Sequence, residues 1–512
     1  MLAFIVRRAV ASFFIVLAST ALMYALVALS GNPLRDLLEL NGPDRAERIA
    51  ARTAALHLDV SVPERYLLWL QDVGRCLVPG SRECTLGLDR GNRAVLPQLQ
   101  AAIGSSLRLV LAATVLALLL GVAAGVATAL RQYSAFDHAI TLIAFLCFSL
   151  PVFWVSTLLK QYVAIDLNTW LADPRLTFGA IGGLGLAAGV AWAFVVGGDR
   201  RRRLVVAALA TAATSGTLLV LLTTGWFTRP ALGTAGIAVS ALVAAFGWVA
   251  LFAGLQPRMR PVLYASCAAA VGGTGVVALA EPALADLTWL TFGLLAAGLV
   301  GFGAAAGWFL GGTRRRLAAA VAALTGASVA VLTAADELLR AYPALYRATG
   351  GRPLATTGSQ TPNLAGTFWE TNLDVGLHLA LPTLAIMAIS FASYTRYTRS
   401  SMLDVLHEDY VRTARAKGLT ERSVVVRHAL RTALLPLATL VAFDFAAVLG
   451  GAVVTETVFG WNGMGRLFTQ GLEHVDPNPV MAFFLVTAVA TVAFNLLADI
   501  AYAWADPRIR LR

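Results

Sequence analysis

The stretch LVLAATVLALLLGVAAGVATAL, residues Leu109–Leu130, contains no charged side chain and decides the class of fold. Roughly 20 such residues, rising 1.5 Å each, cross the hydrocarbon core of a bilayer as a helix. The whole chain agrees: 58% of its 512 residues are hydrophobic, 13% are charged and the mean hydropathy is +0.71. A soluble domain carries about 25% charged residues. The sequence therefore predicts an all-α polytopic membrane protein, because a helix satisfies its own backbone hydrogen bonds in lipid.

Further apolar runs predict more membrane helices at Ala9–Leu29, Ala139–Val163, Leu377–Tyr394, Leu434–Thr455 and Val480–Ala503. Short arginine-rich connections alternate with these runs. If both termini are cytoplasmic, these connections lie on the cytoplasmic side, as the positive-inside rule requires. The net charge of +11 follows from this pattern, so we expect no nucleic-acid partner. The first run is longer than the apolar part of a secretory signal, and we interpret it as a retained helix.

The region between the runs at Ala139 and Leu377 repeats itself. LTFG at 176–179 recurs at 290–293, and GGDRRRR at 197–203 is echoed at the same offset by GGTRRR at 311–316. A third basic segment, Gln256–Arg260, lies halfway between the last two. This periodicity predicts three tandem helical hairpins, each turning at a basic loop, and twelve membrane spans in total.

The repeat suggests a division of the chain into a first part at 1–165, an inserted set of hairpins at 166–365 and a last part at 366–512. The inserted segments are rich in alanine and glycine, which favours close helix contact in lipid. We expect them to be structural or to dock a partner, with a second transport path as the alternative.

A strongly basic stretch lies between two of the core runs. It reads EDYVRTARAKGLTER at Glu408–Arg422 and continues as VVVRHALR at Val424–Arg431. A glycine separates two short helical patterns, which predicts a helix–turn–helix on the cytoplasmic face. We expect Val411, Ala414 and Leu419 to give it an apolar side for a partner protein.

This stretch resembles the cytoplasmic coupling loop, the EAA loop, of ABC importer permeases in the dipeptide, oligopeptide and nickel family. Arg412-Thr413-Ala414 stands where the family pattern has Glu-Ala-Ala, and Gly418 matches its glycine, although Pro436 lies further downstream than the pattern's proline. Other blocks resemble the same family in the same order: FIVRR at 4–8, SLPVFW at 149–154, TRYTRSSM at 395–402, GGAVVTETVFGW at 450–461, GMGRL at 463–467 and DPRIR at 506–510. Together they cover residues 1–165 and 366–512.

The resemblance implies a six-helix type I ABC importer permease core, to which this chain adds about six inserted membrane helices. It also implies that a coupling loop at 400–431 docks on an ATPase subunit. The coupling residues carried over are Arg412, Thr413, Ala414, Arg415, Lys417, Gly418 and Leu419.

The same resemblance implies partners for this chain: a second homologous permease subunit, two ATP-binding subunits, an external substrate-binding protein and membrane lipid. We expect the chain to lie in the cytoplasmic membrane and not to be an enzyme, since it lacks the Gly-x-x-x-x-Gly-Lys-[Ser/Thr] loop that cradles nucleotide phosphates. ATP and Mg²⁺ would bind the partner subunits, with no cofactor in this chain. Short peptides are the expected cargo. Nickel chelates, haem or another small solute are alternatives, and a self-contained channel or secondary transporter is the alternative from another class.

Asp444 and Glu456 are carboxylates within the run at Leu434–Thr455 or at its outer end, where an unpaired charge is costly. Asp444 is interpreted either as a residue of the translocation path or as a helix-packing partner. For Glu456 the alternatives are gating, docking of the binding protein, or a structural role. Asp499 and Asn495 are expected to tie helices together.

Of the four cysteines, Cys147 and Cys267 lie in apolar segments and are expected to be packing residues. Cys76 and Cys84 lie in the predicted external loop, where they form either a disulfide or two free thiols. Lys160 is expected to reach toward the outer membrane interface. No metal site is expected, because the histidine spacings match no ligand pattern.

Overall fold

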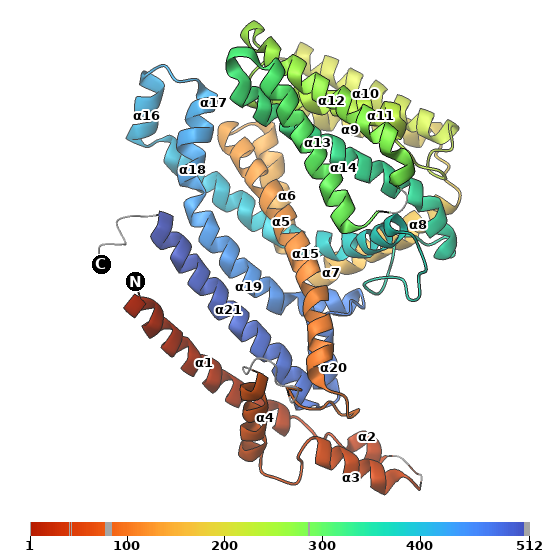
Figure 1. The fold of residues 1–512 in the computed structure, drawn as a ribbon, viewed down its shortest axis with the longest axis vertical. Helices are drawn as coiled ribbons and strands as arrows, with labels where there is room; N and C mark the ends of the chain where they lie inside the picture. Colours follow the sequence, from red (N-terminus) through yellow and green to blue (C-terminus); the bar gives the residue numbers. More distant parts are fainter. Residues whose placement is uncertain (1, 40, 42, 77–83, 285–286, 506–512) are drawn as a thin grey trace. The chain divides into compact units, whose positions relative to one another are not determined.

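A computed structural model of the chain consists of helices and their connections (Figure 1). It describes residues 1–512 apart from 1, 40, 42, 77–83, 285–286 and 506–512. No β-strand occurs in this described part. Ten of the described helices are long and apolar enough to cross a membrane, or eleven if one bent pair counts as a span. The predicted all-α membrane fold is confirmed, and α19 (Leu435–Val458) coincides with the remaining predicted span.

The chain separates into two compact units. Unit 1 contains Met1–Ala164, Thr356–Ser359 and Leu379–Arg512, and unit 2 contains Ile165–Ala355 and Gln360–His378. Each unit is therefore described by itself.

The helices of unit 1 comprise long apolar helices, short helices in the loop predicted to be external and a short basic hairpin. Their bounds are α1 (Leu2–Leu29), α2 (Arg35–Leu38), α3 (Arg45–Ala55), α4 (Val62–Cys76), α5 (Val95–Leu130), α6 (Ala135–Ser149), α7 (Val152–Leu158), the π-helix η1 (Leu159–Ile165), most of α15 (Phe368–Leu406), α16 (Asp409–Ala416), α17 (Glu421–Ser423), the π-helix η5 (Val424–Ala429), α18 (Leu430–Ala433), α19, α20 (Met464–Glu473) and α21 (Pro477–Ala505).

The core of unit 1 forms where α5 meets α15, α19 and α21. Leu109 and Val110 of α5 are fully buried there. Further along α5, a Cβ at Gly121 or Gly125 would clash with Tyr394 or Thr398 of α15. Small residues at these places let the two helices approach closely, which is how membrane helices gain packing energy without a hydrophobic drive.

The predicted third span, Ala139–Val163, is not one straight helix. The structure breaks it at Pro151 into α6 and a second segment, Val152–Ala172, with an angle of 105° between them. Leu150 is extended, with φ −83° and ψ 128°. The cause is local, because a residue before proline is driven out of the helical region and the proline itself lacks the N–H that a continuing helix needs.

Unit 2 contains α8 (Asp166–Ala172) and six long helices in three successive antiparallel pairs. Their bounds are α9 (Phe178–Val196), α10 (Arg200–Thr223), α11 (Gly233–Phe252), α12 (Arg260–Ala280), α13 (Trp289–Leu310) and α14 (Arg315–Ala348), with 3₁₀ turns η2 (Pro257–Met259), η3 (Glu281–Ala283) and η4 (Gly312–Arg314).

The helices α13 and α14 pack most closely. A Cβ at Gly303 would meet the backbone of Ala322, and one at Gly326 would meet the backbone of Leu299. These contacts place small residues four apart on facing helices, the spacing that allows backbones to touch in lipid. The alanine- and glycine-rich composition of the repeat thus has a direct packing role.

Candidate functional site

The basic stretch folds as a compact hairpin of short helices, which we call the coupling segment (residues 408–433). Helix α16 begins after Glu408 and carries Asp409 in its first turn, where a negative charge favours the helix dipole. Gly418 then turns the chain with φ +74°, a conformation that other residues rarely adopt. The hydroxyl of Thr420 accepts a hydrogen bond from the Ser423 N–H and caps α17. The predicted helix–turn–helix is present, with a π-helical turn, η5, in its second arm.

The apolar side of the coupling segment is used by the segment itself. Val411 and Ala414 are buried and pack with Val424 of the second arm and with the end of α15. The expectation that Val411 and Ala414 face a partner protein is therefore wrong, because the two arms fold their apolar faces onto each other. Leu419, at the turn, is 42% exposed and is the one of the three predicted apolar residues that remains on the surface.

The exposed side of the coupling segment is basic. Arg412, Thr413, Arg415 and Lys417 are all exposed, together with Gly418. Arg415 pairs with Glu421 across the turn at 2.7 Å. The hydrogen bond from Arg415 lowers the pKa of the Glu421 carboxyl, so this pair stays charged at neutral pH.

Glu456 is the most buried of the predicted path residues, with 1% of its surface exposed. Its carboxylate accepts hydrogen bonds from the Ser106 hydroxyl (2.5 Å) and from the backbone N–H groups of Gly465 (2.7 Å) and Arg466 (3.3 Å). It thus caps the beginning of α20 and ties that helix to α5. These hydrogen bonds give Glu456 a structural role, because the loop after α19 folds back and encloses its carboxylate; gating or docking of the binding protein stays a proposal.

Asp444 ties two membrane helices together. One carboxylate oxygen, Oδ2, accepts hydrogen bonds from the Ser390 hydroxyl (2.8 Å) and the Tyr394 hydroxyl (2.6 Å), both on α15. Asp444 itself is half-buried, whereas Phe443, its neighbour on α19, is exposed. Asp444 is therefore a helix-packing partner, as one of the two alternatives predicted. A place on the translocation path stays a proposal.

The remaining residues singled out in the sequence make few contacts among the described residues. The Lys160 ammonium donates to the Val458 carbonyl at 3.2 Å, which is at the end of α19 where an outer interface is predicted. The Asn495 carbonyl oxygen is buried and bonds no described residue. The side chain of Asp499 lies outside the described residues. Cys147 and Cys267 are free thiols.

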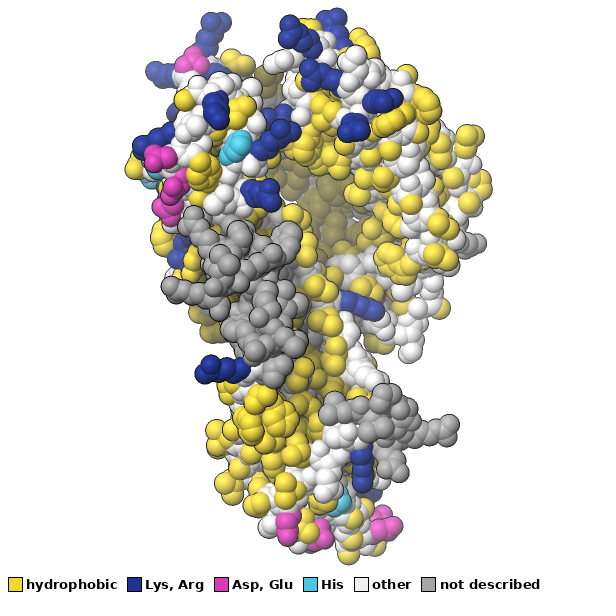
Figure 2. Space-filling view, turned by 60° about the vertical axis from the view of Figure 1, so that its left-hand side comes forward, with side chains coloured by type: hydrophobic (Ala, Val, Ile, Leu, Met, Phe, Trp, Pro, Cys, Tyr) yellow, Lys and Arg dark blue, Asp and Glu magenta, His cyan; other side chains and the backbone are white. Residues whose placement is uncertain are grey.

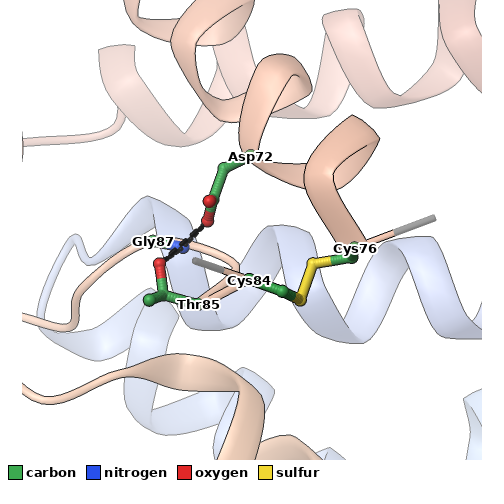
Figure 3. Close-up of a disulfide and its surroundings, with 5 residues drawn as sticks. All are labelled: Asp72, Cys76, Cys84, Thr85 and Gly87. Atoms are coloured by element: carbon green, nitrogen blue, oxygen red, sulfur yellow. Dashed lines mark hydrogen bonds between the residues drawn. A yellow bond between two sulfur atoms is a disulfide. The ribbon is translucent and has the colours of Figure 1, made fainter. Parts of the chain in front are cut away.

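Cys76 and Cys84 form a disulfide, with their Cα atoms 4.8 Å apart (Figure 3). Close by, Asp72 accepts hydrogen bonds from the Thr85 hydroxyl (2.9 Å) and the Gly87 N–H (2.7 Å). The bond and this carboxylate both fasten the end of α4 to the strand-like segment that leads into α5. Between the two alternatives for these cysteines, the structure contains the bonded one.

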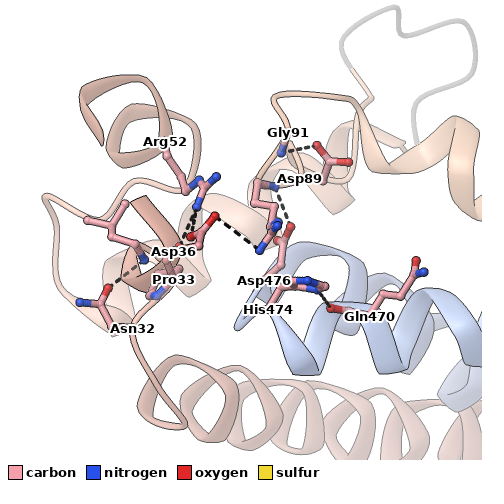
Figure 4. A network of polar contacts seen from close by, with 11 residues as sticks. Asn32, Pro33, Asp36, Arg52, Asp89, Gly91, Gln470, His474 and Asp476 are labelled. Atoms are coloured by element: carbon pink, nitrogen blue, oxygen red, sulfur yellow. Dashed lines mark hydrogen bonds and ion pairs between the residues drawn. The ribbon is translucent and has the colours of Figure 1, made fainter. Parts of the chain in front are cut away.

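A polar cluster on the predicted external side was missed by the sequence analysis (Figure 4). Asp476 is 3% exposed and accepts a hydrogen bond from the Arg90 N–H at 2.6 Å. The Arg90 side chain in turn lies 3.9 Å from Asp36, which pairs with Arg52. Burial raises the pKa of Asp476 to about 6, and the neighbouring Asp89 carboxylate adds to this effect against the Arg90 hydrogen bond. The sequence shows the charged residues of this cluster but not that they lie together, since they are up to 440 positions apart in the chain.

The raised pKa of Asp476 gives a pH prediction. Its folded-state pKa exceeds the ordinary aspartate value of 3.8, so the folded state binds this proton more tightly and the stabilisation fades as pH rises through about 6. Lowering the pH from 7.5 to 5 should therefore raise the free energy of unfolding by about 1 kcal/mol through protonation of Asp476. Asp476→Asn should remove that part of the pH dependence of thermal unfolding.

The matched control for this measurement is Asp36→Asn. The pKa of Asp36 is lowered, because the Arg52 hydrogen bond and charge outweigh the effect of burial, so its titration falls below this pH window. The variant should keep the wild-type difference between pH 5 and pH 7.5. An unchanged difference in Asp476→Asn would show that the buried carboxylate does not titrate as described.

Residues 292–511 match the sequence model of a family described as binding-protein-dependent transport system inner membrane component. The chain is also 44% identical over 155 residues to the oligopeptide transport system permease protein OppB of Mycobacterium tuberculosis, covering 30% of this chain and 48% of that protein. It is 48% identical over 132 residues to the oligopeptide permease protein AppB of Bacillus subtilis (26% and 42% covered), and 44% identical over 138 residues to the dipeptide permease protein DppB of Escherichia coli K12 (27% and 41% covered). The chain spans about half the length of the curated relatives it matches, or somewhat less. The family match includes the coupling segment, Asp444 and Glu456.

Proposed function

We propose that the whole chain is the permease subunit of an ATP-driven importer of short peptides, because residues 292–511 match the model of the binding-protein-dependent transport inner-membrane family. The names of its relatives support the peptide cargo, since they are oligopeptide and dipeptide permease proteins. The chain is a multi-pass membrane protein. We place it in the cytoplasmic membrane with both termini inside, as its arginine-rich connections indicate.

The exposed face of the coupling segment carries this proposal. The segment closes its own apolar interior and leaves a hairpin with Leu419 at its tip and Arg412, Arg415 and Lys417 around it. An exposed apolar side chain surrounded by hydrated charges has the anatomy of a contact with a folded partner, an apolar centre with a polar rim. We propose that the partner is an ATP-binding subunit, whose closure on ATP pushes this hairpin.

The coupling segment is joined to the membrane helices at both of its ends. It follows α15 at one end and continues through η5 and α18 into α19 at the other. A displacement of the hairpin would therefore move α15 and α19, the two helices that Asp444 ties together. We propose that the surface of α19 beside Asp444 lines the translocation path, and that residues 166–365 are an insertion into this permease core.

The complete importer would contain this chain, a second homologous permease, two ATP-binding subunits that bind ATP and Mg²⁺, and an external substrate-binding protein. The test is to purify the full chain with its natural partners in lipid nanodiscs and measure ATP hydrolysis. Addition of the peptide-loaded binding protein is expected to stimulate hydrolysis, and the two ATPases and the second permease should co-purify. Peptide transport by this chain alone in liposomes would overturn the proposal in favour of a self-contained transporter.

A further inference from the structure

The three turns of unit 2 that follow α9, α11 and α13 carry a dense group of arginines, which we call the basic end. All of these side chains are exposed, and none forms an ion pair with a carboxylate among the described residues. One acidic residue, Asp199, lies among them. The arginines are Arg200, Arg201, Arg202, Arg203, Arg258, Arg260, Arg314, Arg315 and Arg316.

The turns lie at the same end of the unit 2 helices (Figure 1). For α11–α12 and α13–α14 the packing shows this directly, since Val249 just before one turn and Val262 just after it share a buried cluster with Ala318 and Val321 just after the other. The polypeptide thus brings two of its basic segments, at 258–260 and 314–316, together at one end of the packed helices α11–α14, and the segment at 200–203 forms the equivalent turn of the α9–α10 pair. Figure 2 shows several groups of Lys and Arg side chains that border surfaces that are largely hydrophobic.

Exposed aromatic side chains lie directly beneath the arginines. Trp192 of α9 and Trp308 of α13 are 55% and 45% exposed, and Phe309 is 82% exposed. The Arg315 guanidinium lies over the Trp308 ring, 4.5 Å from its centroid. Tryptophan rings at the end of a membrane helix mark the level of the lipid headgroups. The arginines above them are therefore at the height of the phosphates.

The opposite end of unit 2 is different. There, Arg340 bonds to Asp336 (2.8 Å) and Glu281 (3.0 Å), and Asp336 also accepts the backbone N–H groups of Leu232 and Gly233. These charges are satisfied within the protein. The basic end has no such partners among the described residues, so its guanidinium groups are available to an outside anion.

We propose that the basic end of unit 2 binds the headgroups of anionic phospholipids. Guanidinium groups match phosphate oxygens with paired hydrogen bonds, and clusters of four or more basic residues beside a membrane helix attract anionic lipid. The hydrophobic sides of the same helices hold the acyl chains; α10 packs on α9 along one side, where Ser215 bonds the Ile181 carbonyl, and its other side is exposed, with Leu204, Leu209 and Val220 on the surface. A lipid satisfies both the charged and the apolar parts of this surface, whereas free phosphate or an acidic protein satisfies only the first.

The experiment uses the full chain in detergent and measures lipid retention by native mass spectrometry, with phosphatidylglycerol and phosphatidylcholine offered in equal amounts. The wild-type chain should retain phosphatidylglycerol preferentially, and the preference should weaken with salt. The triple variant Arg314→Gln, Arg315→Gln and Arg316→Gln should lower bound phosphatidylglycerol several-fold. The quadruple variant with Arg200, Arg201, Arg202 and Arg203 changed to glutamine should do the same.

A matched control changes three exposed arginines elsewhere in unit 2, Arg229, Arg347 and Arg352, to glutamine. It should retain phosphatidylglycerol as the wild type does, and all variants should elute as single species in size-exclusion chromatography. Equal retention of the two lipids, or equal loss in the control, would overturn the proposal. Displacement of the lipid by millimolar inorganic phosphate would instead show a simple phosphate site, and co-purifying RNA or acidic protein would show another polyanion as the occupant.

Discussion

Replacing Leu419 by glutamate is expected to abolish most ATP-driven transport while leaving the permease folded. Leu419 is exposed at the tip of the coupling segment, and the backbone turn beneath it is set by Gly418. The substitution buries a charge at the centre of the proposed contact with the ATPase, and an unpaired charge there costs several kcal/mol. We expect a loss of at least tenfold in the affinity for the ATPase subunit, because each 1.4 kcal/mol is a factor of about ten.

The measurement is co-purification of the ATPase subunit with the variant, together with transport in proteoliposomes. Leu38→Glu is a matched control, since Leu38 is similarly exposed, at 45%, but lies in helix α2, within the loop predicted to be external. Lys417→Glu should also weaken attachment, though less, since rim charges affect association more than they affect the final affinity. Normal ATPase attachment by Leu419→Glu would contradict the proposed role of the hairpin.

The membrane character of the chain could be predicted because it depends on composition and on the length of apolar runs. The three hairpins of unit 2 could also be predicted, since each one repeats its basic turn and its small residues. These features are local in the sequence. They can be predicted without knowing which helix packs against which.

Two of the differences from the structure concern contacts with another segment of the chain, and one concerns a local bend. The pattern of Val411 and Ala414 indicated an apolar side, but the pattern alone does not distinguish a partner protein from the chain's own second arm. In the third predicted span, Pro151 was a local signal of a bend that the long apolar run obscured. The cluster around Asp476 had no local signal, because its contact with Arg90 brings together segments 386 residues apart.

Glu456→Ala is expected to destabilise the fold more than any other single change considered. The substitution leaves the Ser106 hydroxyl and the Gly465 and Arg466 N–H groups without their acceptor and opens a cavity at the start of α20. Buried donors without a partner cost about 1–3 kcal/mol each, so a loss of about 4 kcal/mol is expected. For a chain of this size, the melting temperature of the purified protein should fall by roughly 4 °C.

Glu456→Gln separates this structural role from a role in the transport path. The glutamine oxygen can still accept from Gly465 and Arg466, and its amide can donate to the Ser106 hydroxyl, which already accepts the Met464 N–H. The melting temperature should therefore fall by less than half as much as in Glu456→Ala, and transport should follow stability in both variants. A Glu456→Ala chain with an unchanged melting temperature but greatly reduced transport would instead make this carboxylate part of the path. The loop that encloses the carboxylate would then have to move away from it during the transport cycle.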